Sequence, residues 1–340
     1  MSRSHRAPTT EEIGTDGVAD SPREQASRSH EIERPVVGKP STIGSVPWWS
    51  ANRDWCLLPS RGGSTDILCD AGTVGDAAVL AASLRGDKHK VDGQPNEDSF
   101  AVRTSLDPSG RRFLVAVLCD GLSSAAHSSH GARLSADEVA KALARIVAKH
   151  AGSILEGLDG ILEDGLSAIG GDVLARANDI VRRASDGPHV DLVPSDINAT
   201  LTFLLVPVDL GDAESVTATV GAIGDSPILV LDTNRGTWSS VPLGLEDRDD
   251  DVVSTATRAF PTTTRATVSN VELTRSDVIV AMSDGVSNFV LVRGQQTALA
   301  GYLASNWAQP VRPTTFVNDL SFDLASADDD RTAIACWLQR

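Results

Sequence analysis

The sequence contains no run of about 18 apolar residues, the length that a membrane-spanning helix needs. Its first residues, MSRSHRAPTTEEIGTDG, lack the apolar core of a signal peptide. Both absences argue against secretion or membrane insertion, so we expect a cytoplasmic protein with no membrane partner.

Cysteine is scarce, with four residues in a chain of 340: Cys56, Cys69, Cys119 and Cys336. Their spacing matches neither a zinc site nor a disulfide framework. Cys119 and Cys336 lie in apolar runs, so we predict that both are small core residues.

Positive charge is also in short supply, because 30 Lys and Arg face 46 Asp and Glu and give a formal net charge of -16. Nucleic-acid backbones and anionic membranes are bound by basic patches, so we expect neither as the main partner. A phosphate-bearing substrate stays open, since bound cations can reverse the sign of a local site. The simplest meaning of the acidity is solubility.

The composition divides the chain into three parts. Residues 1–45 are rich in Ser, Thr, Arg, Glu and Pro without an apolar period, which is typical of a disordered tail. Residues 46–80 are mixed, and we predict an extension that packs on the core or links to it. Residues 81–340 show orderly patterns and form one predicted domain; 41% of the whole chain is hydrophobic, enough for a sizeable core.

Apolar periodicity predicts both helices and strands. Helical spacing occurs over 131–149, over 153–184 with a break at Gly170-Gly171, and over 294–307. Short apolar runs predict strands at 100–102, 113–119, 200–206, 216–222, 228–231, 278–282 and 332–338, and a hairpin-like turn over 224–227 joins two of them. Because the helices do not alternate strictly with strands, we expect sheets with helices on their outer faces.

Acidic residues stand at the ends of several predicted strands. Two strands run into Asp120-Gly121 and Asp284-Gly285, where glycine permits close approach of the backbone to a ligand. Asp98 and Asp196 precede other strands, and 328–330 precede the last one. Each is by itself more often an ordinary turn or a solvated loop. If the fold brings them together, their oxygens suit Mg²⁺ or Mn²⁺ rather than zinc.

The order of these motifs resembles the metal-dependent, 2C-type (PPM) serine/threonine protein phosphatases, in particular a bacterial branch. The resemblance covers residues 83–340. Its motifs, in chain order, are Arg85-Gly86-Asp87-Lys88-His89 with Asn96-Glu97-Asp98-Ser99, Val117-Leu118-Cys119-Asp120-Gly121, Asp196-Ile197-Asn198-Ala199-Thr200, Gly224-Asp225-Ser226, Ser283-Asp284-Gly285 and Asp329-Asp330-Arg331-Thr332.

The resemblance implies an α+β fold, a four-layer α-β-β-α sandwich with a metal site at one edge. It implies two or three Mn²⁺ or Mg²⁺ ions and a metal-bound water that attacks phosphoserine or phosphothreonine of a protein substrate in signal transduction. The implied metal ligands are Asp98, Asp120, the carbonyl of Gly121, Asp284 and Asp329, with Glu97 acting through water and Asp196 at a third metal. Asp225 is assigned a structural role in its turn. We expect a monomer.

Three departures from the family pattern bear on activity. Gly93 stands where many relatives have a phosphate-gripping arginine, and Lys90 is our candidate replacement, with Lys88, His89 and Arg85 as alternatives. A histidine usual just beyond the central Asp-Gly is missing.

His127 is our candidate for protonating the leaving group, and His130 is the alternative. The third departure is Asn288, which replaces an outer metal ligand. A catalytically weak or inactive pseudophosphatase that acts as a binding module is therefore the first rival. Another metal-dependent phosphohydrolase or nuclease, and a plain binding protein with acidic loops, are the others.

Overall fold

The structure is a computed structural model, and it describes residues 66–150, 158–184, 190–243, 257–324 and 326–338. The predicted tail over 1–45 and residues 46–65 of the predicted extension lie outside these ranges. None of the helices in the described ranges is both long and apolar enough to span a bilayer.

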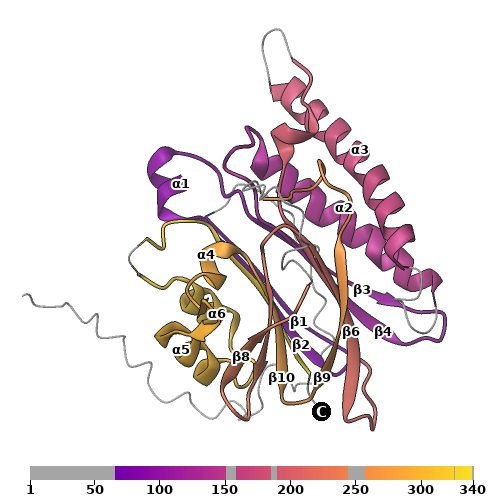
Figure 1. The fold of residues 1–340 in the computed structure, drawn as a ribbon, viewed down its shortest axis with the longest axis vertical. Coiled ribbons are helices and arrows are strands. Elements are labelled where there is room, and N and C mark those ends of the chain that lie inside the picture. Colours follow the sequence, from indigo (N-terminus) through magenta and orange to yellow (C-terminus); the bar gives the residue numbers. More distant parts are fainter. Residues whose placement is uncertain (1–65, 151–157, 185–189, 244–256, 325, 339–340) are drawn as a thin grey trace, which may run out of the picture. The chain divides into compact units, whose positions relative to one another are not determined.

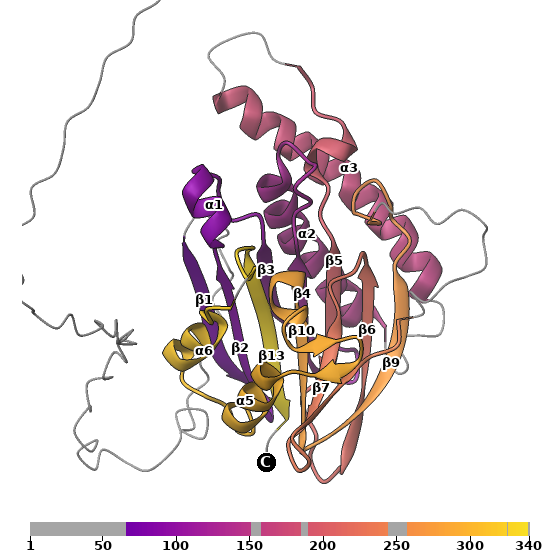
Figure 2. The same cartoon turned by 60° about the vertical axis from the view of Figure 1, so that its left-hand side comes forward.

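Two antiparallel sheets form the centre of the molecule (Figures 1 and 2). The six-stranded sheet has the order β1 (Ile67–Val74), β2 (Ala77–Leu84), β13 (Arg331–Leu338), β10 (Asp277–Met282), β7 (Ile228–Asp232) and β8 (Thr237–Ser240). The five-stranded sheet has the order β3 (Ser99–Leu106), β4 (Arg112–Cys119), β5 (Leu201–Pro207), β6 (Ser215–Ile223) and β9 (Thr267–Thr274).

The central strands are apolar on both faces because each sheet is covered twice. In β4, Leu114 and Leu118 pack into the core between the sheets, whereas Val115 and Cys119 pack against helices on the outside. Side chains alternate along a strand, so a continuous apolar run supplies both cores. Cys119 and Cys336 are fully buried, as the sequence predicts.

Helices cover the outer face of each sheet. Along the five-stranded sheet lie α2 (Ser128–Lys149) and α3 (Leu158–Ala184), and on the six-stranded sheet lie α5 (Ala298–Asn306) and α6 (Pro313–Leu320) (Figure 1). The short elements are α1 (Asp87–Asp92), the 3₁₀ turn η1 (Pro194–Ile197), α4 (Asp284–Ser287), β11 (Leu291–Val292) and β12 (Gln295–Gln296). The predicted four-layer sandwich is confirmed.

Several predicted boundaries differ from the structure. Strands β1 and β2 are integral to the six-stranded sheet, so the domain begins before residue 81 and includes part of the predicted extension. The helix predicted over 294–307 begins only at Ala298, because the Thr297 side chain accepts a hydrogen bond from Ala300 N (3.2 Å) and caps it there. The two residues of β12 precede it.

The predicted break at Gly170-Gly171 is wrong, since α3 runs through both glycines. Packing explains one of them: a Cβ on Gly170 would lie only 2.9 Å from Cβ of Pro261. A larger residue would collide with Pro261, so glycine is favoured here although it costs a helix about 1 kcal/mol relative to alanine.

The hairpin predicted at 224–227 is also wrong. Strand β6 pairs with β5 and β9, whereas β7 pairs with β10 and β8 in the other sheet. The segment therefore carries the chain from one sheet to the other. Gly224 has φ of 105°, a conformation open to glycine and strained for other residues.

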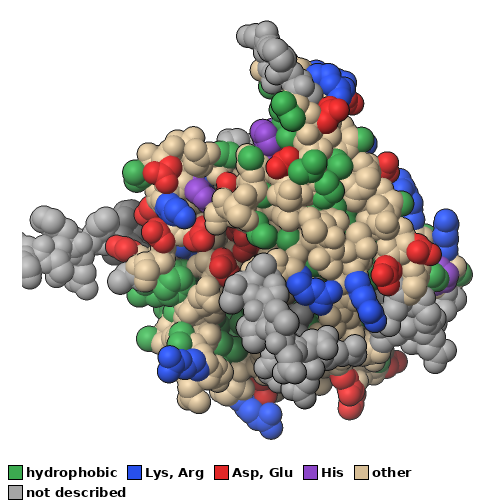
Figure 3. All heavy atoms as spheres, turned by 45° about the horizontal axis from the view of Figure 1, so that its top comes forward, with side chains coloured by type: hydrophobic (Ala, Val, Ile, Leu, Met, Phe, Trp, Pro, Cys, Tyr) green, Lys and Arg blue, Asp and Glu red, His purple; other side chains and the backbone are tan. Residues whose placement is uncertain are grey.

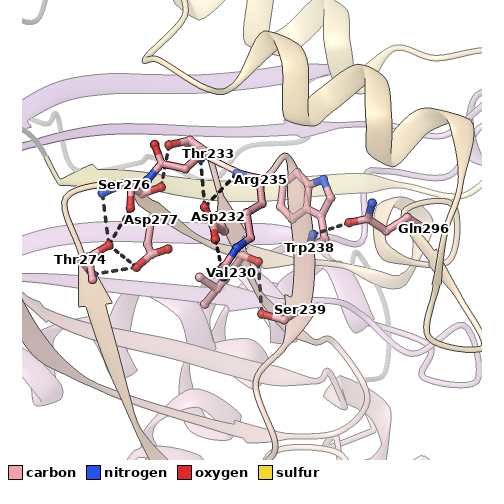
Figure 4. A network of polar contacts seen from close by, with 11 residues as sticks. Val230, Asp232, Thr233, Arg235, Trp238, Ser239, Thr274, Ser276, Asp277 and Gln296 are labelled. Atoms are coloured by element: carbon pink, nitrogen blue, oxygen red, sulfur yellow. Dashed lines mark hydrogen bonds and ion pairs between the residues drawn. The ribbon is translucent and has the colours of Figure 1, made fainter.

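A network of hydrogen bonds surrounds the first residue of β10, Asp277, at the end of the strand away from Asp284 (Figure 4). The backbone N and the Oγ1 of Thr233 both donate to the carbonyl of Ser276, at 2.9 and 2.7 Å. Asp277 Oδ2 accepts from the backbone N and Oγ1 of Thr274, at 2.8 and 2.7 Å. These hydrogen bonds hold the first residues of β10, the strand whose other end leads to Asp284.

Candidate functional site

Strand register gathers the acidic motifs at one edge of the sandwich. Ser99 pairs with Cys119, so Asp98 and Asp120 flank the same edge of the five-stranded sheet. In the other sheet Met282 pairs with Ala333, which brings the residues before β13 beside those after β10. Antiparallel pairing thus joins carboxylates that are far apart along the chain.

A cleft of about 140 Å³ opens where these strand ends meet. Acidic side chains gather on this face of the molecule (Figure 3). The residues that line the cleft are His89, Glu97, Asp98, Asp120, Gly121, Leu122, Ser123, Thr200, Asp225, Thr257, Asp284, Asp329 and Asp330.

Asp120 is held from both sides of its backbone. Its N donates to Oγ1 of Thr200 (3.1 Å), and its carbonyl accepts from N of the same residue (2.7 Å). The hydroxyl groups of Thr200 and Ser226 lie 2.8 Å apart, which fixes the threonine in turn. Oδ2 of Asp120 accepts a long 3.4 Å contact from the backbone N of Asp284, so the two acidic segments touch.

Asp98 is the most enclosed of the predicted ligands, with 8% of its surface exposed. Its backbone N donates to Oδ1 of Asn96 (2.9 Å), and the nearby side chains of Thr332 and Ser283 favour the charged form of its carboxyl group. Its Oδ2 has no hydrogen-bond partner among the described residues. The site therefore contains a buried oxygen that is available to a ligand.

Burial and mutual repulsion disfavour charge on these carboxylates. Burial, and then the neighbouring Asp330, raises the pKa of Asp98 well above its usual range. Burial, followed by Asp98 and Asp284, does the same to the pKa of Asp120. The pKa of Asp284 is raised by burial, then by Asp329 and Asp225. Carboxylates this close are stable in the charged form only when a positive group neutralises them.

Asp330, which precedes strand β13, contacts residues 85–99, here called the opening segment. Its Oδ1 accepts from the backbone N of Gly86 and its Oδ2 from that of Glu97, both at 2.6 Å. Oδ2 also lies 2.9 Å from Nδ1 of His89, at an ion-pair distance but without hydrogen-bond alignment. The sequence assigned no role to Asp330, because its partners lie more than 230 positions away.

The donor set fits a hard divalent cation in chemistry. The cleft offers several carboxylate oxygens, two of which, Oδ2 of Asp98 and Oε2 of Glu97, are buried without a hydrogen-bond partner in the described part of the chain. Oxygen ligands of this kind suit Mg²⁺ and Mn²⁺. No three His, Cys, Asp or Glu residues in the described ranges are arranged closely enough to form a ready-made metal site. A cation would draw the carboxylates inward.

The structure brings together most of the predicted site residues. Glu97, Asp98, Asp120, Gly121, Asp284 and Asp329 all line the cleft.

Three predicted residues, Asp196, Lys90 and His127, do not line it. The side chain of Asp196 accepts from the backbone N of Val193 (2.9 Å), and Nζ of Lys90 pairs with Asp87 (3.0 Å). His127 precedes α2, where its backbone N donates to the carbonyl of Asp196 (2.7 Å). Exposed Asn288 does not line the cleft either.

Two further lining residues were given other roles at the sequence level. Asp225, assigned to its turn, faces the cleft near Asp284 because the 224–227 segment crosses between the sheets at this edge. His89 was only one of four basic alternatives, and it is the one that reaches the cleft. The sequence places Asp225 in a recognisable motif, but which way a turn presents its side chain depends on strand pairing.

Comparison with known proteins gives one family match. The pattern of the family described as "Protein phosphatase 2C" matches residues 85–327. No curated protein sequence matches the chain.

Solved structures of bacterial phosphatases resemble the chain in fold. The serine/threonine phosphatase Stp1 from Staphylococcus aureus is 14% identical with a TM-score of 0.45, covering 79% of this chain and 97% of its own. PppA of Pseudomonas aeruginosa is 20% identical with a TM-score of 0.46, covering 78% and 98%. The Mycobacterium tuberculosis serine/threonine phosphatase PstP/Ppp is 20% identical with a TM-score of 0.47, covering 78% and 99%. Similarities at this level do not bear on activity.

Proposed function

The chain belongs to the protein phosphatase 2C family of serine/threonine protein phosphatases, and from that premise we propose that it hydrolyses phosphoserine and phosphothreonine in proteins with the help of divalent cations held in its acidic cleft. The single observation that supports this best is the convergence of carboxylates from four distant segments, carrying Asp98, Asp120, Asp284 and Asp329, on one cleft. Their mutual repulsion has no structural benefit, so we infer that it serves cation binding.

The residues that would hold the cations follow from their placement. Asp98 and Asp284 are the two charges that most raise the pKa of Asp120 after burial, and all three line the cleft, so Asp120 is suited to contact two cations. Asp329 and the carbonyl of Gly121 complete the proposed inner set, and Glu97 would act through water. Bound there, Mn²⁺ or Mg²⁺ would lower the pKa of a water and offset the charge of the phosphoryl group. A third cation at Asp196 stays a prediction.

The chain's own groups prepare the site for this chemistry. Thr200 fixes the backbone of Asp120, and the Ser283 and Thr332 side chains lie near the carboxyl of Asp98 and favour its charged form. These contacts come from three different strand ends, so the fold fixes the backbone position of Asp120 and the surroundings of the Asp98 carboxyl. Ligands carried on fixed strand ends lose less conformational entropy on binding a cation than ligands on free loops.

Replacement of Asp120 by Asn tests the proposal. The substitution keeps the shape and removes one charge, so we expect Mn²⁺-dependent hydrolysis of p-nitrophenyl phosphate and of a phosphothreonine peptide to fall by about 100-fold or more. Mn²⁺ affinity, measured by calorimetry, should fall as well, while the circular dichroism spectrum stays unchanged. Asp164→Asn, on the exposed side of α3, is the matched control and should behave as wild type.

Full turnover by the Asp120→Asn variant would contradict the proposal. A folded wild-type protein without turnover at any Mn²⁺ concentration would instead favour the pseudophosphatase, a binding module with the same fold. Asn288 is exposed and lies outside the cleft lining, so the presence of asparagine at this position does not favour the pseudophosphatase hypothesis.

A further inference from the structure

The acidic cleft poses an electrostatic problem for a phosphoryl substrate. Among the ionisable side chains that line it, all are carboxylates except that of His89. A phosphate monoester carries up to two negative charges, and the positive charge of the proposed cations would be shared between the carboxylates and the substrate. A positively charged or hydrogen-donating side chain at the cleft wall would complete the binding site.

His89 is built into that wall. It lies in α1 with 6% of its surface exposed and is the buried residue of that helix. Nδ1 is 2.9 Å from Oδ2 of Asp330, whose carboxylate is itself fixed by the backbone N–H groups of Gly86 and Glu97 at 2.6 Å each. Because Nδ1 is buried and faces Asp330, Nε2 is the nitrogen left for a ligand; it lies 3.9 Å from Oε2 of Glu97.

The other basic residues of the same segment are committed elsewhere. Nε of Arg85 pairs with Asp66 at 3.3 Å, and Nζ of Lys90 pairs with Asp87 at 3.0 Å. Lys88 is exposed, and none of the three lines the cleft. His89 is thus the one basic side chain of the opening segment that reaches the site.

We propose that His89 contacts the phosphoryl group of the substrate through Nε2, and that Asp330 is the positioning residue that turns the ring toward it; this inference rests on the proposed function. With Nδ1 facing the Asp330 carboxylate, Nε2 is the ring nitrogen placed to donate a hydrogen bond to a phosphoryl oxygen. The pair supplies one directed donor at the cleft wall, and the cations supply the remaining positive charge.

Two substitutions at position 89 test the proposal, with p-nitrophenyl phosphate as substrate and inorganic phosphate as inhibitor at saturating Mn²⁺. His89→Leu removes both nitrogens, so we expect KM and the inhibition constant of phosphate to rise about tenfold or more, as for a lost hydrogen bond to a charged group. His89→Gln keeps one N–H donor and should recover part of the loss. His150→Leu, at the exposed end of α2, is the matched control and should change neither constant.

Calorimetric titration with Mn²⁺ alone separates this proposal from the proposed function. We expect His89→Leu and His89→Gln to bind Mn²⁺ as wild type does, because carboxylates hold the cation. Unchanged KM and phosphate inhibition in a folded His89→Leu variant would overturn the role of His89 and leave the proposed function intact. So would a loss of Mn²⁺ affinity without a rise in KM, since it would make His89 a metal ligand. A wild-type protein that binds no Mn²⁺ would overturn the proposed function and this inference together.

Discussion

At Gly121 the backbone passes so close to the opening segment that no other residue fits without movement. A Cβ there would lie 2.7 Å from the carbonyl oxygen of Glu97 and 2.8 Å from Cβ of Ser128. The backbone N of Gly121 also donates to that carbonyl, at 3.1 Å. The glycine therefore allows Asp120 and Glu97, two proposed cation ligands, to share one wall of the cleft.

Gly121→Ala should push these two segments apart. Overpacking of this kind costs about 1–3 kcal/mol, so we expect the free energy of unfolding in urea to fall by that amount. Mn²⁺-dependent turnover should fall about tenfold or more because Asp120 and Glu97 are displaced. Gly301→Ala, in an exposed turn of α5 with open space around it, is the control. Equal activity of Gly121→Ala and wild type would show that the cleft tolerates the displacement.

At the scale of elements, the loop between α6 and β13 carries Asp329 and Asp330 into the cleft. Arg331 follows them and hydrogen-bonds back to the last residue of α6 and to this loop. The guanidinium donates from Nη1 to the carbonyl of Leu320 (3.3 Å) and from Nη2 to that of Ala327. It also lies over the ring of Phe322, 4.5 Å from its centroid. Arg331 is 9% exposed, so these contacts are shielded from water.

Arg331→Met should release this loop. Two buried carbonyl contacts and a cation–π contact disappear, so we expect the free energy of unfolding to fall by about 2–4 kcal/mol. The apparent Kd for Mn²⁺ should rise, with turnover recovering at high Mn²⁺ because Asp329 itself is retained. Arg331→Lys keeps the charge but cannot reach both carbonyls, so it should be intermediate. Wild-type Mn²⁺ affinity in Arg331→Met would mean that the loop holds its shape without the arginine.

Helix α3 offers a comparison between adjacent glycines. Gly171 is exposed with nothing near its would-be Cβ, so Gly171→Ala should stabilise the protein by about 0.5–1 kcal/mol through helix propensity. Gly170→Ala should not, because its Cβ would meet Pro261 at 2.9 Å. Thermal unfolding of both variants measures the difference. Equal stabilisation by the two substitutions would show that α3 and the 261 region move apart readily.

At the scale of the whole molecule, the cleft couples stability to pH and to cations. The pKa values of Asp98, Asp120 and Asp284 are raised in the folded protein, first by burial. The cation-free folded state therefore holds protons that the unfolded chain releases near pH 4. The stability from these groups is present below that pH and declines as pH rises through the raised values.

Cations compete with those protons, so their stabilising effect should grow as pH rises. We expect the increase in Tm caused by a fixed concentration of Mn²⁺ to be larger at pH 8 than at pH 5.5. Thermal unfolding with and without Mn²⁺ across this range measures it, and Asp120→Asn should weaken the trend. A Mn²⁺ effect that does not vary with pH would contradict proton–cation competition in the cleft.

The sequence by itself determined most of the central apolar strands, the acidic motifs at their ends and, through the order of those motifs, the family. This was possible because strands buried on both faces are continuous apolar runs, and because Asp-Gly pairs directly after them are local signals. It also predicted the four layers and six residues that line the cleft.

Only the tertiary structure decided that the 224–227 segment connects strands of two different sheets. It also decided which basic side chain reaches the cleft. Hairpins and sheet crossings begin with similar turn residues, and long-range pairing chooses between them. His89 and Lys90 are adjacent in sequence, but successive residues in a helix point about 100° apart. One therefore faces Asp330 across the cleft wall while the other pairs with Asp87 outside it.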